Sequence, residues 1–251
     1  TVLEAYTQLQ LGDGHDFGSL SSSSLIYLGL GTNLISNRSD NVTIANELIR
    51  WDSWGPGDYG NDFIQNGTGT VTLSNPNNSF HGYLRANNGG ITVTGSAGNS
   101  DNYVANNGQA VVFNTTNANQ SINNISGTGT FNVTGTGTLT LNESRNGTFT
   151  GTTTIDSGAT LELQYGKLDG DITNNGTLYF NNPQTIDYGG VISGSGNFKQ
   201  NSGTLYLTGA NTYTGTTSIG PDSGANFYLG YGGTTGSLAS VSDISVGSGS
   251  T

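Results

Sequence analysis

The sequence predicts an all-β fold, namely a right-handed parallel β-helix (β-solenoid) with three short strands per coil and about eleven coils. Two observations support this prediction: a long repeat returns along the chain, and apolar residues inside it alternate with polar ones in short runs bounded by glycine. A strand of this kind cannot bury its apolar side alone. Stacked coils can, because each covers the apolar side chains of its neighbour.

The long repeat is clearest in three glycine-led segments. Gly69-Thr-Val-Thr-Leu73 returns as Gly137-Thr-Leu-Thr-Leu141 and as Gly203-Thr-Leu-Tyr-Leu207, at spacings of 68 (137 − 69) and 66 (203 − 137). Other glycine-led strand signals, such as those at Gly90, Gly108 and Gly129, divide each copy into shorter steps. Each copy is therefore expected to hold three coils of roughly 22 residues. Three further tripeptides keep the same register: Phe80-His-Gly, Phe149-Thr-Gly and Tyr213-Thr-Gly.

Within each strand signal the apolar residues stand two positions apart, as in Leu139 and Leu141. Side chains alternate across a strand, so Leu139 is expected to point inward and Thr140 outward. Parallel strands joined by short turns favour right-handed winding. At a strand spacing of about 4.8 Å, eleven coils would form a rod on the order of 50 Å long.

The amino-acid composition and net charge argue against several classes of function. Charged residues make up 9% of the 251 residues and the net charge is −11, so a neutral and acidic surface of Asn, Ser and Thr is expected to repel nucleic acid and anionic lipid. No run of eighteen apolar residues is present, so no direct membrane insertion of this segment is expected. The absence of Cys excludes disulfides, thiolate catalysis and Cys-based zinc sites.

The repeat predicts one elongated domain over residues 1–251, with N-terminal coils in 1–40 and repeat-containing coils in 41–251. No secretion signal opens the chain, and residues 241–251 read like a coil that stops before its glycine-led strand is complete. The segment is therefore expected to be part of a longer protein.

The last copy of the repeat resembles a known family. Gly203-Thr-Leu-Tyr-Leu-Thr-Gly-Ala-Asn-Thr-Tyr-Thr-Gly-Thr-Thr-Ser-Ile219, with Val191-Ile-Ser-Gly-Ser-Gly-Asn-Phe198 before it and Gly236-Ser-Leu238 after it, closely resembles the autotransporter-associated β-strand repeat. This repeat occurs in passenger domains of bacterial type V secretion. The resemblance covers residues 41–251 and is most specific at 194–238. The copy at 60–95 departs from it, with Gly82-Tyr-Leu-Arg85 in place of glycine followed by threonines.

The resemblance implies an exported β-helix at the bacterial cell surface, displayed outside the outer membrane or released. It does not fix an activity, because unrelated functions share one fold.

Three patterns could carry catalysis or bind metal, and each has a simpler reading as a turn. Asp222-Ser-Gly looks like part of a serine protease site, but Asp156-Ser-Gly stands in the equivalent place one repeat earlier, and only His15 and His81 could serve as base. Asp169 and Asp171 could act as paired carboxylates on a glycan, yet aligned positions one coil on are Asn, Gly and Thr. Residues 12–16 and 57–62 faintly resemble calcium turns, but each is single where a calcium β-roll needs tandem copies.

Two surface patterns also have structural readings. Recurring Thr-x-Thr raises an ice-binding alternative, which would need one Thr pair per coil on one flat face, whereas Thr is also a good exposed strand residue. Asn-x-Ser/Thr triplets, such as those at Asn41, Asn119 and Asn175, are expected by chance in this composition, and the predicted roles of these asparagines are turn formation and stacking between coils.

The clearest departure from the repeat holds both tryptophans, in Trp51-Asp-Ser-Trp54-Gly-Pro-Gly-Asp-Tyr59. Aromatic rings beside carboxylates in a Gly- and Pro-broken loop suit contact with a glycan or a protein partner. The alternative is that the rings cover the side or the N-terminal end of the solenoid. The candidate contact residues are Trp51, Asp52, Trp54, Asp58 and Tyr59.

The predicted function is therefore that of a surface adhesin passenger that is not an enzyme and has no cofactor or metal. Its partner is another copy of itself on a neighbouring cell, leading to autoaggregation and biofilm, or else a host glycan or surface protein. A passive stalk that presents another domain is a third reading.

Overall fold

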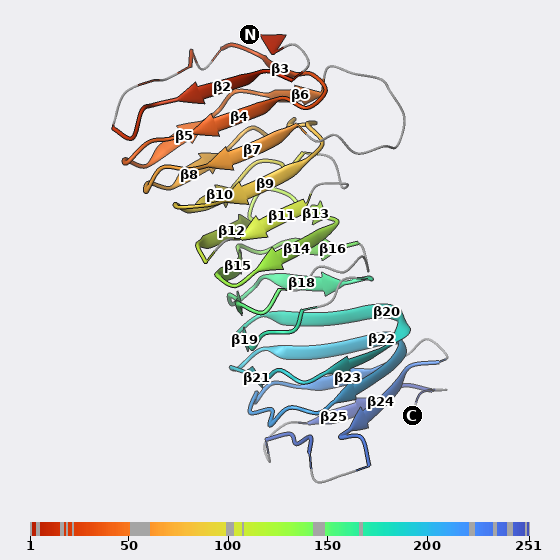
Figure 1. Ribbon diagram of the computed structural model, residues 1–251. Coiled ribbons are helices and arrows are strands. Elements are labelled where there is room, and N and C mark those ends of the chain that lie inside the picture. Colours follow the sequence, from red (N-terminus) through yellow and green to blue (C-terminus); the bar gives the residue numbers. More distant parts are fainter. Residues whose placement is uncertain are drawn as a thin grey trace.

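The computed structural model describes the chain except residues 1, 4–5, 16–17, 19, 22, 51–60, 99–102, 107, 143–148, 166–167, 221–223, 233–234, 240–242, 249 and 251. The described residues form 25 strands and no helix, and the strands pair in parallel to build a β-solenoid of about nine turns (Figure 1). The all-β solenoid prediction is confirmed. The turns are fewer than eleven because the first ones are longer: the step from Leu34 to its partner Phe63 (63 − 34 = 29) exceeds the step from Phe63 to Leu84 (84 − 63 = 21).

The strands form four sheets that run along the rod. Sheet A contains β1 (Val2–Leu3), β3 (Ile26–Leu28) and β6 (Leu48–Arg50). Sheet B contains β2 (Gln8–Leu11), β4 (Asn33–Ser36), β7 (Asp62–Gln65), β9 (Tyr83–Ala86), β11 (Tyr103–Asn106) and β14 (Asn124–Gly127).

Sheet C contains β5 (Val42–Ile44), β8 (Val71–Leu73), β10 (Ile91–Val93), β12 (Ala110–Asn114), β15 (Thr130–Thr134), β17 (Thr152–Ile155), β19 (Ile172–Asn174) and β21 (Ile192–Ser193). Sheet D contains β13 (Gln120–Ile122), β16 (Thr138–Leu141), β18 (Thr160–Leu163), β20 (Thr177–Tyr188), β22 (Asn197–Leu207), β23 (Thr217–Ile219), β24 (Asn226–Leu229) and β25 (Ile244–Val246).

The long repeat is not a whole number of coils. Along sheet C, Val71 pairs with Ile91, which pairs with Val111, which pairs with Phe131, so each coil advances the chain by the same step (91 − 71 = 20). The spacing between the first two copies (137 − 69 = 68) therefore spans three coils and about one further face. The prediction that each copy is three coils was wrong in this respect, although the short extra step from Gly129 to Gly137 already signalled it.

Consequently, equivalent strands of the three copies lie at different places around the rod. Val71 lies in sheet C and Leu139 in β16 of sheet D, while Leu205 lies in the second half of β22, which pairs with β24. All three side chains are buried. The same pattern of inward-pointing residues thus lies on a different face of the solenoid in each copy.

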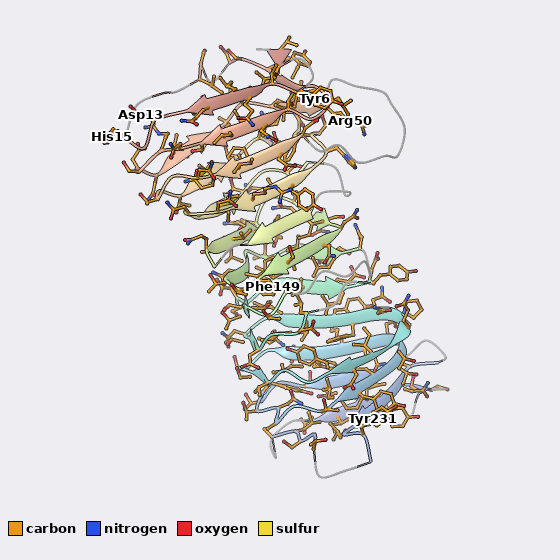
Figure 2. The ribbon with its side chains drawn as sticks, in the orientation of Figure 1. Tyr6, Asp13, His15, Arg50, Phe149 and Tyr231 are labelled. Atoms are coloured by element: carbon orange, nitrogen blue, oxygen red, sulfur yellow. The ribbon has the colours of Figure 1, made fainter. Side chains whose placement is uncertain are left out.

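The core is a continuous column of side chains from the alternating inward positions. Phe113, Phe131 and Phe149 follow one another with ring centroids 6.0 Å apart in edge contacts. Phe149, labelled in Figure 2, and its equivalent in the repeat, Tyr213, are fully buried. The glycine two residues after each of them must stay small, because a Cβ at Gly151 or Gly215 would overlap the backbone of the preceding coil.

Candidate functional site

One group of predicted contact residues lies outside the part of the chain that the structure describes: Trp51, Asp52, Trp54, Asp58 and Tyr59. On the C-terminal side of this segment, Asn61 is buried and donates its side-chain amide to the carbonyl of Leu28 at 2.8 Å. Asp62 accepts the backbone N–H of Tyr83 at 3.0 Å and forms an ion pair with Arg85 at 2.6 Å. Asn61 and Asp62 are therefore fixed at the start of sheet B's β7, and the contact by the predicted residues stays a prediction.

Two described acids of the segments compared with calcium loops, Asp13 and Asp62, have partners within the protein. Asp13 accepts the backbone N–H of His15 at 3.2 Å, an ordinary turn contact, and Asp62 is engaged by Arg85. Asp16 lies outside the described residues. Among the described residues there is no group of three His, Asp or Glu side chains that could hold a metal ion.

The paired carboxylates Asp169 and Asp171 are exposed, and Asp171 caps the next coil. One of its oxygens accepts the backbone N–H of Val191 at 2.8 Å. Between the two acids, the Tyr188 hydroxyl donates to the carbonyl of Gly170 at 2.5 Å. Burial of this phenol raises its pKa, and the charges of Asp171 and Asp169 add to the rise. Asp169 and Asp171 thus belong to a turn, in agreement with the interpretation of this sequence pattern as a turn.

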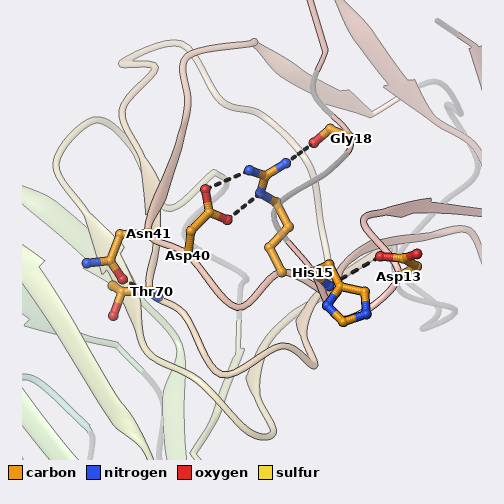
Figure 3. A network of polar contacts seen from close by, with 7 residues as sticks. Asp13, His15, Gly18, Asp40, Asn41 and Thr70 are labelled. Carbon is orange, nitrogen blue, oxygen red and sulfur yellow. Dashed lines mark hydrogen bonds and ion pairs between the residues drawn. The ribbon is translucent and has the colours of Figure 1, made fainter.

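The Asp-Ser-Gly triplet at 156–158 is also a turn. Ala159 donates its backbone N–H to the Asp156 carbonyl at 3.0 Å, and Gly158 has a φ of +91°. The equivalent Asp222 and Ser223 lie outside the described residues. His81 contributes its backbone carbonyl to Asn61, and the exposed His15 lies beside Asp13 in another turn (Figure 3).

A buried arginine ties the N-terminal loop to the solenoid. Arg38 contacts both carboxylate oxygens of Asp40, at 2.8 and 2.7 Å, and donates to the carbonyl of Gly18 at 2.5 Å (Figure 3). The hydrogen bond from Arg38 holds the pKa of Asp40 below its usual range. The charges of Arg38 and Asp40 are therefore engaged by partners within the same chain.

Side-chain carbonyls of asparagine link successive coils. The Asn41 side chain accepts the backbone N–H of Thr70 at 2.8 Å (Figure 3), and Asn119 does the same for Thr138 at 2.8 Å. Asn197 accepts from Thr216 at 3.1 Å. The predicted role of the surface asparagines in turns and coil stacking is confirmed at Asn41 and Asn119.

The outward side of sheet C differs from that of the other sheets in its charge. None of its eight strands contains Asp, Glu, Lys or Arg, whereas sheets A, B and D contain charged residues within their strands, for example Arg50, Asp62 and Glu162. The register aligns one outward row along the sheet: Thr43, Thr72, Thr92, Val112, Asn132, Thr154, Thr173 and Ser193. Val112 and Asn132 interrupt the threonines, so the row lacks the regular array that ice binding would need.

Three tyrosines that the sequence analysis did not single out form a second surface feature. Tyr206 of β22 contacts both Tyr228 of β24 and Tyr231, which follows β24 near the C-terminal end. The signal that could have found them is a departure from the repeat, because Tyr206 stands where the earlier copies have Thr72 and Thr140.

Three segments of the chain match the family model described as a passenger-associated-transport-repeat: residues 63–95, 131–163 and 198–220. Their starting positions are almost evenly spaced along the chain, and they begin on sheets B, C and D in turn. The segment at 63–95, which departs most from the pattern by sequence, is matched as fully as the second. No curated protein and no solved structure matched the chain.

The predicted resemblance to a repeat-bearing autotransporter passenger is confirmed. Such repeats imply a secreted or surface-displayed protein, and this repeat family and fold are typically non-catalytic. None of the described residues forms a helix that could span a membrane.

Proposed function

We propose that this repeat-bearing passenger is an adhesin, displayed outside the outer membrane, that joins neighbouring cells by self-association through the outward side of sheet C. The observation that carries the proposal is the absence of charge from all eight strands of that sheet in a chain whose net charge is −11.

The distribution of charge determines which side of the solenoid can contact the same side of a second copy. Two copies with a charge of −11 repel each other, and the repulsion is strongest where acidic groups approach closely. Charged groups also lose hydration when they enter an interface. A face of Thr, Asn and Ser avoids both costs and keeps hydroxyl and amide groups for hydrogen bonds.

The length of the face suits many weak contacts. Eight rungs about 4.8 Å apart form a row on the order of 34 Å long. Each neutral hydrogen bond contributes about 1 kcal/mol net, so association needs many of them and gains from many copies on each cell. Adhesion is then distributed along the rod, without a single pocket.

Two outward substitutions on sheet C test the proposal in a settling assay with cells that display the chain. Thr92→Asp with Thr154→Asp places two negative charges three rungs apart on the uncharged row. We expect aggregation to be lost, while either change alone weakens it only in part. The matched control is Thr138→Asp with Thr177→Asp, two outward positions of sheet D. Equal settling of the sheet C variant and wild type would refute the proposal.

Contact with a host glycan or protein is the second candidate. The observations that favour it are the exposed rings of Tyr228 and Tyr231 beside Tyr206, and the concentration of aromatic residues that the sequence places at 51–59. Binding to host cells by aggregation-defective variants would separate this function from self-association.

A further inference from the structure

We infer that Tyr206, Tyr228 and Tyr231, here called the tyrosine platform, form a binding site for a neutral carbohydrate. The platform lies on β22 and β24 of sheet D, apart from the uncharged row of sheet C. It is thus independent of the self-association proposed above.

The three rings form one compact surface. The rings of Tyr206 and Tyr228 stack with centroids 4.8 Å apart and planes 15° apart. Tyr231 also contacts Tyr206, with centroids 4.6 Å apart and planes 49° apart. Tyr228 keeps 45% of its surface exposed and Tyr231 keeps 68%, so both side chains are accessible to a ligand from solvent.

A dedicated turn places the third ring. Tyr231 stands between Gly230 and Gly232, each with a φ of +77°, a conformation that favours glycine. The Gly230 N–H donates to the carbonyl of Leu207 at 2.8 Å and fixes the turn against β22. Tyr231 thereby lies on the outside of the solenoid near its C-terminal end (Figure 2).

The fold itself does not require the stacked pair. In the second copy of the repeat, the outward positions equivalent to Tyr206 and Tyr228 are Thr140 and Glu162, on paired strands of the same kind. The turn tyrosine is shared, because Tyr165 is equivalent to Tyr231 and is 42% exposed. Only the third copy combines the turn tyrosine with two outward rings.

Polar groups flank the platform along the strands. Asp187 is in register with Tyr206 and accepts a hydrogen bond from Thr208 at 3.3 Å. Two residues before the stacked tyrosines on the same strands, the Asn226 amide donates to the Thr204 hydroxyl at 3.5 Å. An apolar surface framed by hydroxyl, amide and carboxylate groups matches a sugar, whose ring carries C–H groups on its face and hydroxyls at its edge. Tyrosine suits such contacts because it offers a large rigid surface with little conformational freedom to lose.

The charge around the platform selects the class of sugar. Asp187 is exposed beside the rings, and β20, β22 and β24 carry only one basic residue, Lys199, in the first half of β22. Lys199 pairs with Tyr179 and Ser218, away from the half that holds Tyr206. An acidic surface disfavours sulfated or uronic glycans, so the expected ligands are neutral oligosaccharides.

The test measures binding of the immobilised chain to soluble hexasaccharides of glucose, galactose and N-acetylglucosamine, with an oligogalacturonate as the anionic probe. We expect saturable binding of at least one neutral oligosaccharide and none of the oligogalacturonate. Tyr206→Thr with Tyr228→Glu installs the residues of the second copy, which the fold accommodates, and should weaken binding at least tenfold. Tyr165→Ala removes the equivalent turn tyrosine from that copy and should leave binding within twofold of wild type.

Three results would overturn the inference. These are no saturable binding of any neutral oligosaccharide, equal binding by the wild type and the Tyr206→Thr/Tyr228→Glu variant, or concentration-dependent dimers in sedimentation that this variant abolishes. The last result would assign the platform to contact between copies. Thermal unfolding of each variant confirms that the solenoid is intact.

Discussion

Sheets C and D differ on their outward sides although similar residues lie beneath them. Under sheet C lie Val71, Ile91, Val111 and Phe131, and under sheet D lie Leu139, Leu161, Leu178 and Phe198, all fully buried. Outside, the middle row of sheet C is uncharged, whereas that of sheet D contains Thr140, Glu162, Tyr179 and Lys199 in register. The inward pattern therefore maintains the solenoid, and the outward residues are free to differ from face to face.

This comparison also shows what the sequence could predict. The alternation of apolar and polar residues identified the strands and the buried positions, because side chains alternate across a strand and the apolar ones are buried between stacked coils. It could not identify the face of each strand, since the long repeat moves on by about one face per copy. The uncharged row and the tyrosine platform depend on that placement, so neither was predicted. Sequence could identify Trp51 and Trp54 as exceptional because they interrupt the repeat.

The largest effect is expected inside the column. Leu139→Asp puts an unpaired charge among buried side chains and should lower the free energy of unfolding by several kcal/mol. The outward Thr138→Asp should stay within about 1 kcal/mol of wild type. Thermal or urea unfolding of the two variants measures the difference, and equal losses would contradict the inward and outward assignment.

Thr140, the neighbouring outward residue, is a poorer control. Its hydroxyl donates to a carboxylate oxygen of Glu162 at 3.1 Å, so Thr140→Asp would place two like charges side by side.

A smaller effect is expected at alkaline pH. The raised pKa of Tyr188 means that the folded protein keeps this proton where the unfolded chain loses it. Its contribution is fully present below the ordinary tyrosine pKa of about 10 and falls by about 1.4 kcal/mol per pH unit above it. Tyr188→Phe should flatten the decline in stability just above that pKa, as measured by denaturant unfolding. An unchanged decline would mean that other groups dominate.

The smallest change in stability is expected at the aromatic loop. If Trp51 and Trp54 contact a ligand, replacing both by Ala should remove binding to host cells and leave the free energy of unfolding within about 1 kcal/mol of wild type. Their fluorescence should be accessible to a water-soluble quencher. Strongly blue-shifted emission that resists the quencher would show that the rings cover the solenoid instead.

Self-association through sheet C is tested most directly by determining which faces meet when cells aggregate. The chain has no cysteine, so one introduced thiol reports on one position. Asn132→Cys lies outward near the middle of sheet C, where a two-fold arrangement brings a residue close to its own copy. Thr160→Cys lies outward on sheet D and serves as the control. With a short thiol cross-linker and two differently tagged cell populations, we expect mixed covalent dimers for Asn132→Cys and none for Thr160→Cys. Dimers from Thr160→Cys alone, or from both variants equally, would contradict self-association through sheet C.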